Sequence, residues 1–367
     1  MSSSFSSLRL FSRSSSVVAI VFFFILMIEC MRRMLNRDAL KNSRERALRN
    51  SKHNRYIYSS SEEEIMQFTF YDQTNAYKGK TFSRNLTSFI DNWKIGDKNA
   101  YTLSQINSSD VVFITYGSSN HFHESRKAVS SLRSAYQNKI VFYDLGLKAE
   151  EVNELADVCN LERTPFNYSK YPDFVRELFQ YHFKAIIMAE AYSQFESYWI
   201  MDASVRFSND SSLPEFYSKI SMGEMESLVM RFPSSHSILA ATHPGMYDYL
   251  PIVAERALEI TMRAATVMFI TQSDLSREAV KWNVLCALTE DCFAPRGSEL
   301  NCKFDNARRV YAHCNRYDQS AINIIMESLL DRDGWIRNII NDDGGMSKFI
   351  SVQREDKQDK KLSIPCH

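Results

Sequence analysis

The sequence predicts an α/β fold in which a mainly parallel central sheet is covered by helices on both faces. Three runs that begin at Asp110, Lys139 and Tyr198 are almost continuously apolar, which is typical of strands buried on both faces. Segments of helical character separate these runs along the chain. Each run also ends in or contains small polar or acidic residues, and ligands bind at the carboxyl ends of such strands.

Apolar runs, turn residues and charges set the limits of the predicted elements. Glu150 and Glu151 belong to the first turn of one helix, where acidic side chains stabilise the helix dipole. Tyr171 and Pro172 interrupt the chain before the longest helix. In chain order we expect a strand at 110–119, a helix at 123–136, a strand at 139–147, helices at 149–158 and 173–194, strands at 198–207 and 237–243, and a helix after 318.

The N-terminal segment differs from this body. Val17 to Ile28 reads VVAIVFFFILMI, which is the only stretch apolar enough to enter a bilayer. We therefore expect a cytosolic tail at 1–16, a transmembrane signal anchor at 17–31, a polar stem at 32–64 and a luminal domain at 65–367. As a helix the anchor is about 22 Å long, which suits the thinner membranes of the early secretory pathway.

The features downstream of the anchor favour a luminal body. Six of the seven cysteines lie there, together with four Asn-x-Ser/Thr glycosylation sites at Asn85, Asn107, Asn167 and Asn209. The prediction is a single-pass type II membrane glycoprotein of the Golgi or endoplasmic reticulum. A cleaved signal peptide and a transit peptide are alternatives. The basic residues that follow the anchor would place the body in the cytosol under the positive-inside rule, and we give the glycosylation sites and cysteines more weight.

Composition excludes a general nucleic-acid-binding role. The chain has 44 basic and 44 acidic side chains, so no net field attracts a polyanion. Hydrophobic residues make up 44%, including 24 Phe and 18 Tyr, which is enough for a large core. The expected partners are small molecules or other proteins, and the membrane through one helix.

Asp202 is the strongest candidate for a metal ligand. It follows the apolar run Tyr198-Trp-Ile-Met, and an aspartate at a strand end can hold a hard divalent cation such as Mn²⁺ or Mg²⁺. His243, in the loop after the predicted strand 237–243, is the second candidate ligand. Ser204 stands where a second aspartate would complete an Asp-x-Asp pair, and a hydroxyl is a weak ligand. Pairing of Asp202 with Arg206 is the structural alternative.

Asp318 and Gln319 are the candidate catalytic residues. They precede an amphipathic helix and would contact sugar or acceptor hydroxyls, although a helix cap explains them equally well. Four further residues are candidates for binding a nucleotide donor through turn backbone, ribose or phosphate contacts. They are Gly117, Ser118, Asp144 and Lys184.

The cysteine spacing argues against a zinc site, because no Cys-x-x-Cys pair occurs. The six downstream cysteines allow fifteen pairings, between which the sequence does not choose. We expect the cluster from Cys286 to Cys314 to be bridged locally.

The segments 112–122, 141–147, 198–207, 242–247 and 316–323 together resemble a nematode-expanded family of single-pass membrane proteins with a domain of unknown function. That family in turn resembles the GT-A glycosyltransferases, which are nucleotide-diphospho-sugar transferases. The resemblance implies a GT-A-like fold behind the signal anchor and a metal role for Asp202. It also implies a sugar or acceptor role for Asp318 and Gln319. The departure at Ser204 puts metal dependence in doubt.

The resulting expectation is a glycosyltransferase that moves a sugar from a nucleotide-diphosphate donor, UDP-linked, to a glycan or protein acceptor. The first alternative is a catalytically inactive GT-A-like glycoprotein that acts as a binding or scaffold protein. The second is a Rossmann-type methyltransferase, because Tyr143-Asp-Leu-Gly resembles a cofactor-binding strand end, but a second glycine is missing.

Overall fold

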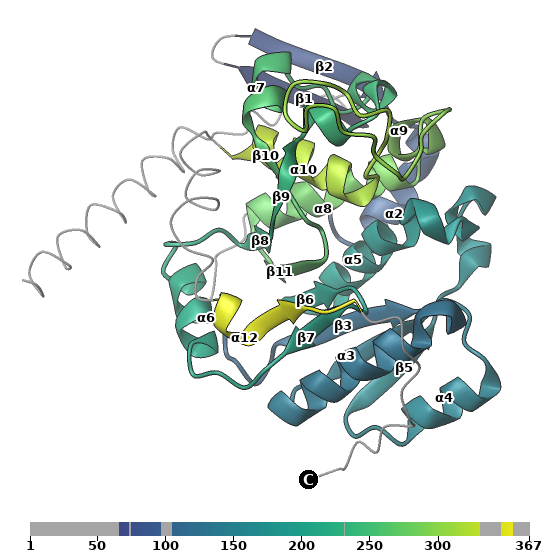
Figure 1. The fold of residues 1–367 in the computed structure, drawn as a ribbon, viewed down its shortest axis with the longest axis vertical. Coiled ribbons are helices and arrows are strands. Elements are labelled where there is room, and N and C mark those ends of the chain that lie inside the picture. The colour runs from purple at the N-terminus through teal and green to yellow at the C-terminus, as the bar shows by residue number, and fades with distance from the viewer. Residues whose placement is uncertain (1–65, 73–74, 97–104, 231, 331–345, 355–367) are drawn as a thin grey trace, which may run out of the picture. The chain divides into compact units, whose positions relative to one another are not determined.

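The computed structural model describes residues 66–72, 75–96, 105–230, 232–330 and 346–354, and its central feature is a six-stranded sheet (Figure 1). Four adjacent strands pair in parallel, whereas the strand Val267–Thr271 is antiparallel to both of its neighbours, so five of the six strands run in one direction. The order across the sheet is β5 (Leu161–Pro165), β4 (Ile140–Asp144), β3 (Val112–Gly117), β6 (Ser197–Met201), β11 (Val267–Thr271) and β8 (Leu228–Met230). The predicted mainly parallel α/β fold is confirmed.

Helices cover both faces of this sheet (Figure 1). Every residue of β3 and β6 is buried, because α3 (Phe122–Ala135) and α6 (Leu213–Ser221) pack on one face and α5 (His182–Gln194) on the other. Behind α5 lies α8 (Asp274–Ala287), which packs in turn against α10 (Asp318–Leu329). This layering explains why β3 and β6 are continuously apolar.

Trp199 on β6 is the centre of the largest aromatic cluster on the α6 face. Its ring stacks on Phe216 and meets Phe207 and Phe349 edge to face, and its Nε1 donates to the Tyr217 hydroxyl at 2.9 Å. Phe207 belongs to β7 (Val205–Phe207), which pairs with β12 (Ile350–Val352) after the short helix α12 (Met346–Phe349). These contacts fix the chain immediately after β6, where Asp202 lies.

The other elements form the periphery. A hairpin joins two strands near the start of the described chain, and a second two-stranded sheet lies beside α10. The strands are β1 (Gln67–Asp72), β2 (Asn75–Thr81), β9 (Pro233–Ser237) and β10 (Thr261–Arg263). The helices are α2 (Thr87–Asn92), α4 (Ala149–Ala156), α7 (Ala254–Glu259) and α9 (Glu290–Phe293).

The predicted strand at 237–243 is wrong. Ser237 ends β9, and Leu239–Ala241 form a 3-10 helix. The Ser237 hydroxyl accepts a hydrogen bond from the Ala240 amide at 3.1 Å, so it caps a helical turn where a strand was expected. His243 therefore does not follow a strand of the central sheet.

Two other predicted elements are interrupted. The helix expected at 173–194 begins with two 3-10 turns, Asp173–Arg176 and Leu178–Gln180, and becomes α-helical only after Tyr181. The strand expected at 198–207 is divided at Asp202 into β6 and β7. Both interruptions fall at the candidate site.

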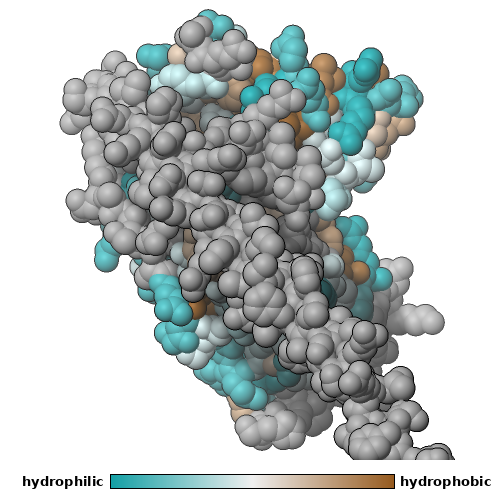
Figure 2. Space-filling model, turned by 90° about the vertical axis from the view of Figure 1, so that its left-hand side faces the viewer, coloured by the Kyte–Doolittle hydropathy of each residue, from teal (hydrophilic) through white to brown (hydrophobic). Residues whose placement is uncertain are grey.

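The predicted anchor at 17–31 lies outside the described residues. Within the ranges that the structure does describe, no helix combines the length and hydrophobicity needed to cross a membrane. On the face in Figure 2, hydrophilic residues and small hydrophobic patches alternate outside the grey atoms. Large exposed hydrophobic side chains such as Phe179, Met222 and Phe304 lie in separate segments of the chain, as is usual for a protein surface.

Candidate functional site

The carboxyl ends of β3 and β6 mark the point where the strand order reverses. The chain proceeds from β3 outward through β4 to β5, and then returns to place β6 on the other side of β3. In open α/β sheets the crevice beside such a reversal is the usual ligand site. Tyr116 lies near the end of β3 and Asp202 directly follows β6, so these two residues flank the crevice.

A buried lysine connects this crevice to α10. The Nζ atom of Lys184, in the first turn of α5, lies 2.8 Å from Asp202 Oδ1 and 2.9 Å from Asp318 Oδ2. Only 3% of the Lys184 side chain is exposed, against 12% for Asp318 and 31% for Asp202. The Tyr116 hydroxyl also donates to Asp202 Oδ1. Four residues from separate parts of the chain therefore form one hydrogen-bonded cluster.

The charges in the cluster support one another. Burial alone would lower the pKa of Lys184, but Asp202 and Asp318 outweigh burial and hold it well above its usual value, so the ammonium form persists. Burial raises the pKa of the Asp318 carboxyl, and Lys184 opposes that shift. Burial, with the charge of Asp202, raises the pKa of Tyr116 well above its usual value. Tyr116 therefore remains a neutral donor.

Strained backbone precedes both helices that contribute to the cluster. Tyr181, directly before α5, has φ 59°, and Tyr317, directly before α10, has φ 41° and ψ −105°. Non-glycine residues rarely adopt positive φ, and each such residue costs about 1–3 kcal/mol. Strain of this kind clusters at functional sites. Here it sets the starts of the two turns that carry Lys184 and Asp318.

The cluster forms one wall of a cavity of about 70 Å³. Sites that enclose a whole small molecule measure roughly 300–1,000 Å³, so this cavity can enclose only a part of one, such as a phosphate group. The Nε2 atom of Gln319 is buried and has no hydrogen-bond partner among the residues that the structure describes. The polar residues that line the cavity are Tyr181, Lys184, Asp202, Thr266, Arg316, Asp318, Gln319 and Arg354.

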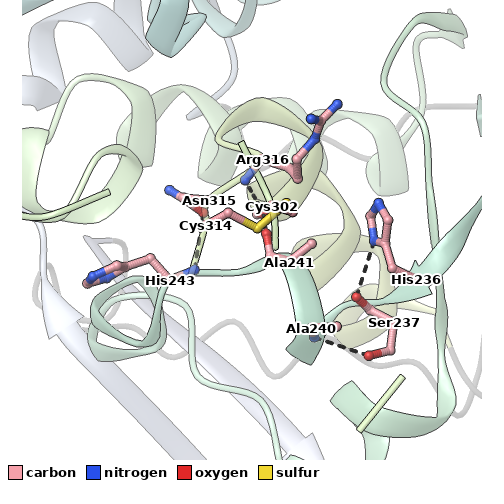
Figure 3. The surroundings of a disulfide bond; sticks show 10 residues. His236, Ser237, Ala240, Ala241, His243, Cys302, Cys314, Asn315 and Arg316 are labelled. Atoms are coloured by element: carbon pink, nitrogen blue, oxygen red, sulfur yellow. Dashed lines mark hydrogen bonds between the residues drawn. A yellow bond between two sulfur atoms is a disulfide. The ribbon is translucent and has the colours of Figure 1, made fainter. Parts of the chain in front are cut away.

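A disulfide positions the segment that leads into α10. Cys302 is bonded to Cys314, and two residues later the Arg316 amide donates to the Ala241 carbonyl at 3.1 Å (Figure 3). A second disulfide joins Cys286 to Cys292. The expected local bridging of this cysteine cluster is confirmed.

The structure brings together four of the residues singled out in the sequence. Asp202, Lys184, Asp318 and Gln319 all line the same cavity. Asp318 is the first residue of α10 and Tyr317 is its cap, so the helix-cap interpretation does not account for the Asp318 side chain, which pairs with Lys184. The proposed pairing of Asp202 with Arg206 is replaced by the pairing with Lys184.

His243 is not part of this cavity. Its Nδ1 accepts a hydrogen bond from the Gly245 amide at 3.1 Å, so the ring caps the 3-10 helix Pro244–Asp248. In Figure 3 the side chains of His243 and Arg316 point away from each other. Among the described residues, no group of three His, Cys, Asp or Glu side chains is placed to hold a metal ion. Asp202 lines the cavity and His243 does not, so the structure does not bring the two predicted ligands together, and their metal roles stay predictions.

Gly117, Ser118 and Asp144 also lie outside the cavity lining. Asp144 is committed to structure, because Oδ1 accepts from the Gly146 and Leu147 amides and Oδ2 pairs with Arg163 at 2.6 Å. Gly117 packs so closely on α3 that a Cβ atom would lie 2.4 Å from Ser125 Oγ. The half-buried Ser118 caps the next turn without a side-chain bond. Their donor-binding roles stay predictions.

Sequence reasoning missed four residues of the site: Tyr116, Tyr181, Arg316 and Arg354. Tyr116 lies in an apolar strand and read as core. Arg316 could have been singled out from the sequence, because it lies two residues before the candidate residue Asp318. Nothing local distinguishes Tyr181 or Arg354 from other surface residues.

His182, the first residue of α5, is expected to make folding pH-dependent. Burial lowers its pKa to about 4, and its Nδ1 lies 2.7 Å from the Ala287 carbonyl oxygen. Between pH 4 and about 6.5 the unfolded chain binds a proton that the folded chain does not, so stability is lost as pH falls through this window. Relative to pH 7, His182 should cost about 2 kcal/mol at pH 5. Urea unfolding of wild type and His182→Gln at both pH values measures this, and equal pH dependence in the two proteins would contradict it.

Comparison with known families gives one match. The family model described as "Protein of unknown function (DUF1647)" matches residues 56–189. This range includes β3, β4, β5 and Lys184 but ends before Asp202 and Asp318. No curated protein matches the chain.

Several solved glycosyltransferases resemble the fold at low identity. The galactosyltransferase LgtC, in complex with donor and acceptor sugar analogs, is 11% identical over 46% of this chain and 61% of its own, with a TM-score of 0.32. The bifunctional glycosyltransferase WbbM is 11% identical over 62% and 40%, with a TM-score of 0.36. GlyE of Streptococcus pneumoniae is 13% identical over 60% and 44%, with a TM-score of 0.32.

This chain therefore spans about three fifths of the first of these proteins and two fifths of the second. Identities and TM-scores this low describe a similarity and assign none of their activities to this chain. The mixed α/β fold around a mostly parallel sheet is a property of this chain's own structure.

Proposed function

We propose that this protein transfers a sugar from a nucleotide-diphosphate donor, UDP-linked, to a glycan or protein acceptor. The observation that carries this proposal is the Lys184 ammonium held between Asp202 and Asp318 at the reversal point of the sheet. A cation at this position would stabilise a ligand whose negative charge increases during the reaction. The diphosphate leaving group of a nucleotide sugar is such a ligand.

The cavity supplies both charge signs that this reaction needs. Lys184, Arg316 and Arg354 outnumber Asp202 and Asp318 among its described lining residues, so its formal charge is positive. In the transfer, the bond between the sugar carbon and the diphosphate oxygen breaks, and a bond to the acceptor oxygen forms. The acceptor proton passes to a base or to solvent. Fixed cations beside the departing oxygen stabilise the transition state without reorganisation.

Gln319 and Asp318 are assigned to the sugar or acceptor side. The unpaired Gln319 amide has hydrogen-bonding capacity that no described residue uses. Because burying an unpaired amide is costly, a bound hydroxyl or phosphate oxygen is the natural partner.

Donor turnover tests this proposal. The full-length protein would be incubated separately with UDP- and GDP-sugars, and ³¹P NMR would follow release of the nucleoside diphosphate by transfer or slow hydrolysis. Release from one donor class, absent in an Asp202→Asn control, is expected. A folded protein that releases diphosphate from none of them with any glycan or protein acceptor would contradict it.

A binding or scaffold role is the second candidate. Ser204 is buried and does not line the cavity, and the two carboxylates among the described lining residues, Asp202 and Asp318, are bridged by one ammonium. Donor binding without turnover would distinguish this role from catalysis.

The expected setting is the lumen of the Golgi or endoplasmic reticulum, with one type II membrane helix. All four asparagines of the glycosylation motifs, Asn85, Asn107, Asn167 and Asn209, are exposed, which glycan attachment requires. We expect peptide N-glycosidase to increase the electrophoretic mobility of the full-length protein made in animal cells. A variant with all four residues changed to glutamine should show no shift. An unshifted wild-type protein would refute luminal placement.

A further inference from the structure

We propose that Lys184 is the resident cation of this site and occupies the place of a divalent metal ion, so that the donor diphosphate binds without one. Only the identity of the ligand in this inference rests on the proposed function. The cation itself is argued from the geometry of Lys184, Asp202 and Asp318.

The ammonium group of Lys184 lies between two carboxylates. Lys184 Nζ contacts one oxygen of each carboxylate, at 2.8 Å and 2.9 Å, and its side chain is almost fully buried. An ammonium at this point pairs with the same two carboxylates that a metal ion would use, and it offsets one of their two negative charges. Two anions and one cation leave the cluster with a single negative charge.

Few side chains described at this site could bind a metal ion. Asp202 Oδ1 already accepts hydrogen bonds from Lys184 and Tyr116. No third carboxylate, histidine or cysteine joins the two aspartates among the described residues, and His243 is engaged with the Gly245 amide. A divalent ion bound to either aspartate, at about 2.0–2.1 Å for Mg²⁺, would lie within a few ångströms of the ammonium in a buried site. Charge repulsion at this distance disfavours the metal.

The site has hydrogen-bond donors left for a ligand. An ammonium has three N–H donors, and two of those on Lys184 have carboxylate acceptors within the described chain. The third has no acceptor among the described residues, and Lys184 lines the cavity. Gln319 lines the same cavity, is 6% exposed, and its Nε2 has no partner within the described part of the chain. Arg316 adds a guanidinium. These donors match the oxygen atoms of a phosphate group.

Direct Mn²⁺ binding tests the inference without any donor. The full-length protein would be titrated with Mn²⁺, and electron paramagnetic resonance would measure the loss of the free-ion signal. Wild type should show no Asp202-dependent binding at millimolar Mn²⁺. Lys184→Gln releases both carboxylates and should bind Mn²⁺ at least about tenfold more tightly, and Asp202→Asn in the same chain should abolish the gain.

Two controls sharpen this experiment. Lys184→Arg keeps the charge and should bind no Mn²⁺. Lys139→Gln removes a lysine from an exposed pair with Glu162, and should behave as wild type. Asp202-dependent Mn²⁺ binding by wild type overturns the inference. Failure of a folded Lys184→Gln variant to gain a site also overturns it.

If the Lys184→Gln variant does not fold, a second measurement on the wild-type protein tests the inference. Calorimetry would compare the dissociation constant of the donor for wild type in EDTA and in Mn²⁺, and equal values are expected. A donor that binds more than about tenfold more weakly in EDTA overturns the inference. Absence of donor binding in both conditions refutes the proposed function, while the Mn²⁺ titration of wild type still decides whether the site excludes metal.

Discussion

Asp202→Asn should lower the rate of sugar transfer by about 10²–10³-fold, the size of effect seen when one preorganised electrostatic contact is removed. Asparagine has nearly the same shape as aspartate, but it lacks the negative charge that pairs with Lys184 and that strengthens the hydrogen bond from the Tyr116 hydroxyl. The ammonium would then pair with Asp318 alone. Steady-state kinetics with the UDP-sugar found to bind would measure the loss.

A matched control separates this effect from general loss of an acidic residue. Asp173→Asn changes a fully exposed carboxylate that makes only a loose pair with Arg176, and it should leave turnover unchanged. Circular dichroism should show both variants folded, since Lys184 keeps one carboxylate partner. Full activity in a folded Asp202→Asn variant would remove Asp202 from the reaction.

Gln319→Met should raise stability and lower function. The Nε2 atom of Gln319 is buried and no described residue pairs with it, so an apolar side chain of similar shape should add about 1 kcal/mol to the free energy of unfolding. The same change removes a donor reserved for the ligand, and donor affinity or turnover should fall about 10–100-fold. Urea unfolding and donor titration measure the two effects on one variant.

Asn323→Leu supplies the contrast on the same helix. Asn323 is fully buried, but its amide is satisfied by the backbone of Arg263 and by the Gln319 carbonyl. Removing it leaves those groups unpaired and should destabilise the fold by about 1–3 kcal/mol. If Gln319→Met loses stability as Asn323→Leu does, the Gln319 side chain is structural and its assignment to a ligand is wrong.

The parallel half of the fold could be predicted from sequence because its signals are local. Strands β3 and β4 and helices α3 and α4 lie within a few residues of their predicted limits, since each is a continuous apolar run or an amphipathic segment bounded by polar residues. The run at 237–243 is equally apolar, but apolar content alone does not distinguish a strand from a buried 3-10 turn. β11 was missed although Val267–Thr271 is wholly buried, because its antiparallel pairing depends on distant residues.

The candidate site shows the same division. Asp202, Asp318 and Gln319 were predicted individually, from a strand end and a helix start. Their meeting around Lys184 could not be predicted, because the ion pairs join residues far apart in the chain and depend on how α5 and α10 pack. A lysine reads as a surface residue unless its burial partners are known.

The most direct test of the central claim is a measurement of donor binding by the full-length protein. The melting temperature would be recorded with each UDP- and GDP-sugar, in EDTA and in Mn²⁺. Ligand at about 100 times its dissociation constant adds about 2.7 kcal/mol of stability, which corresponds to several degrees for a domain of this size. We predict a shift with one donor class that is the same in EDTA and in Mn²⁺ and is lost in Asp202→Asn. No shift with any nucleotide sugar, from protein that unfolds cooperatively, would contradict the account.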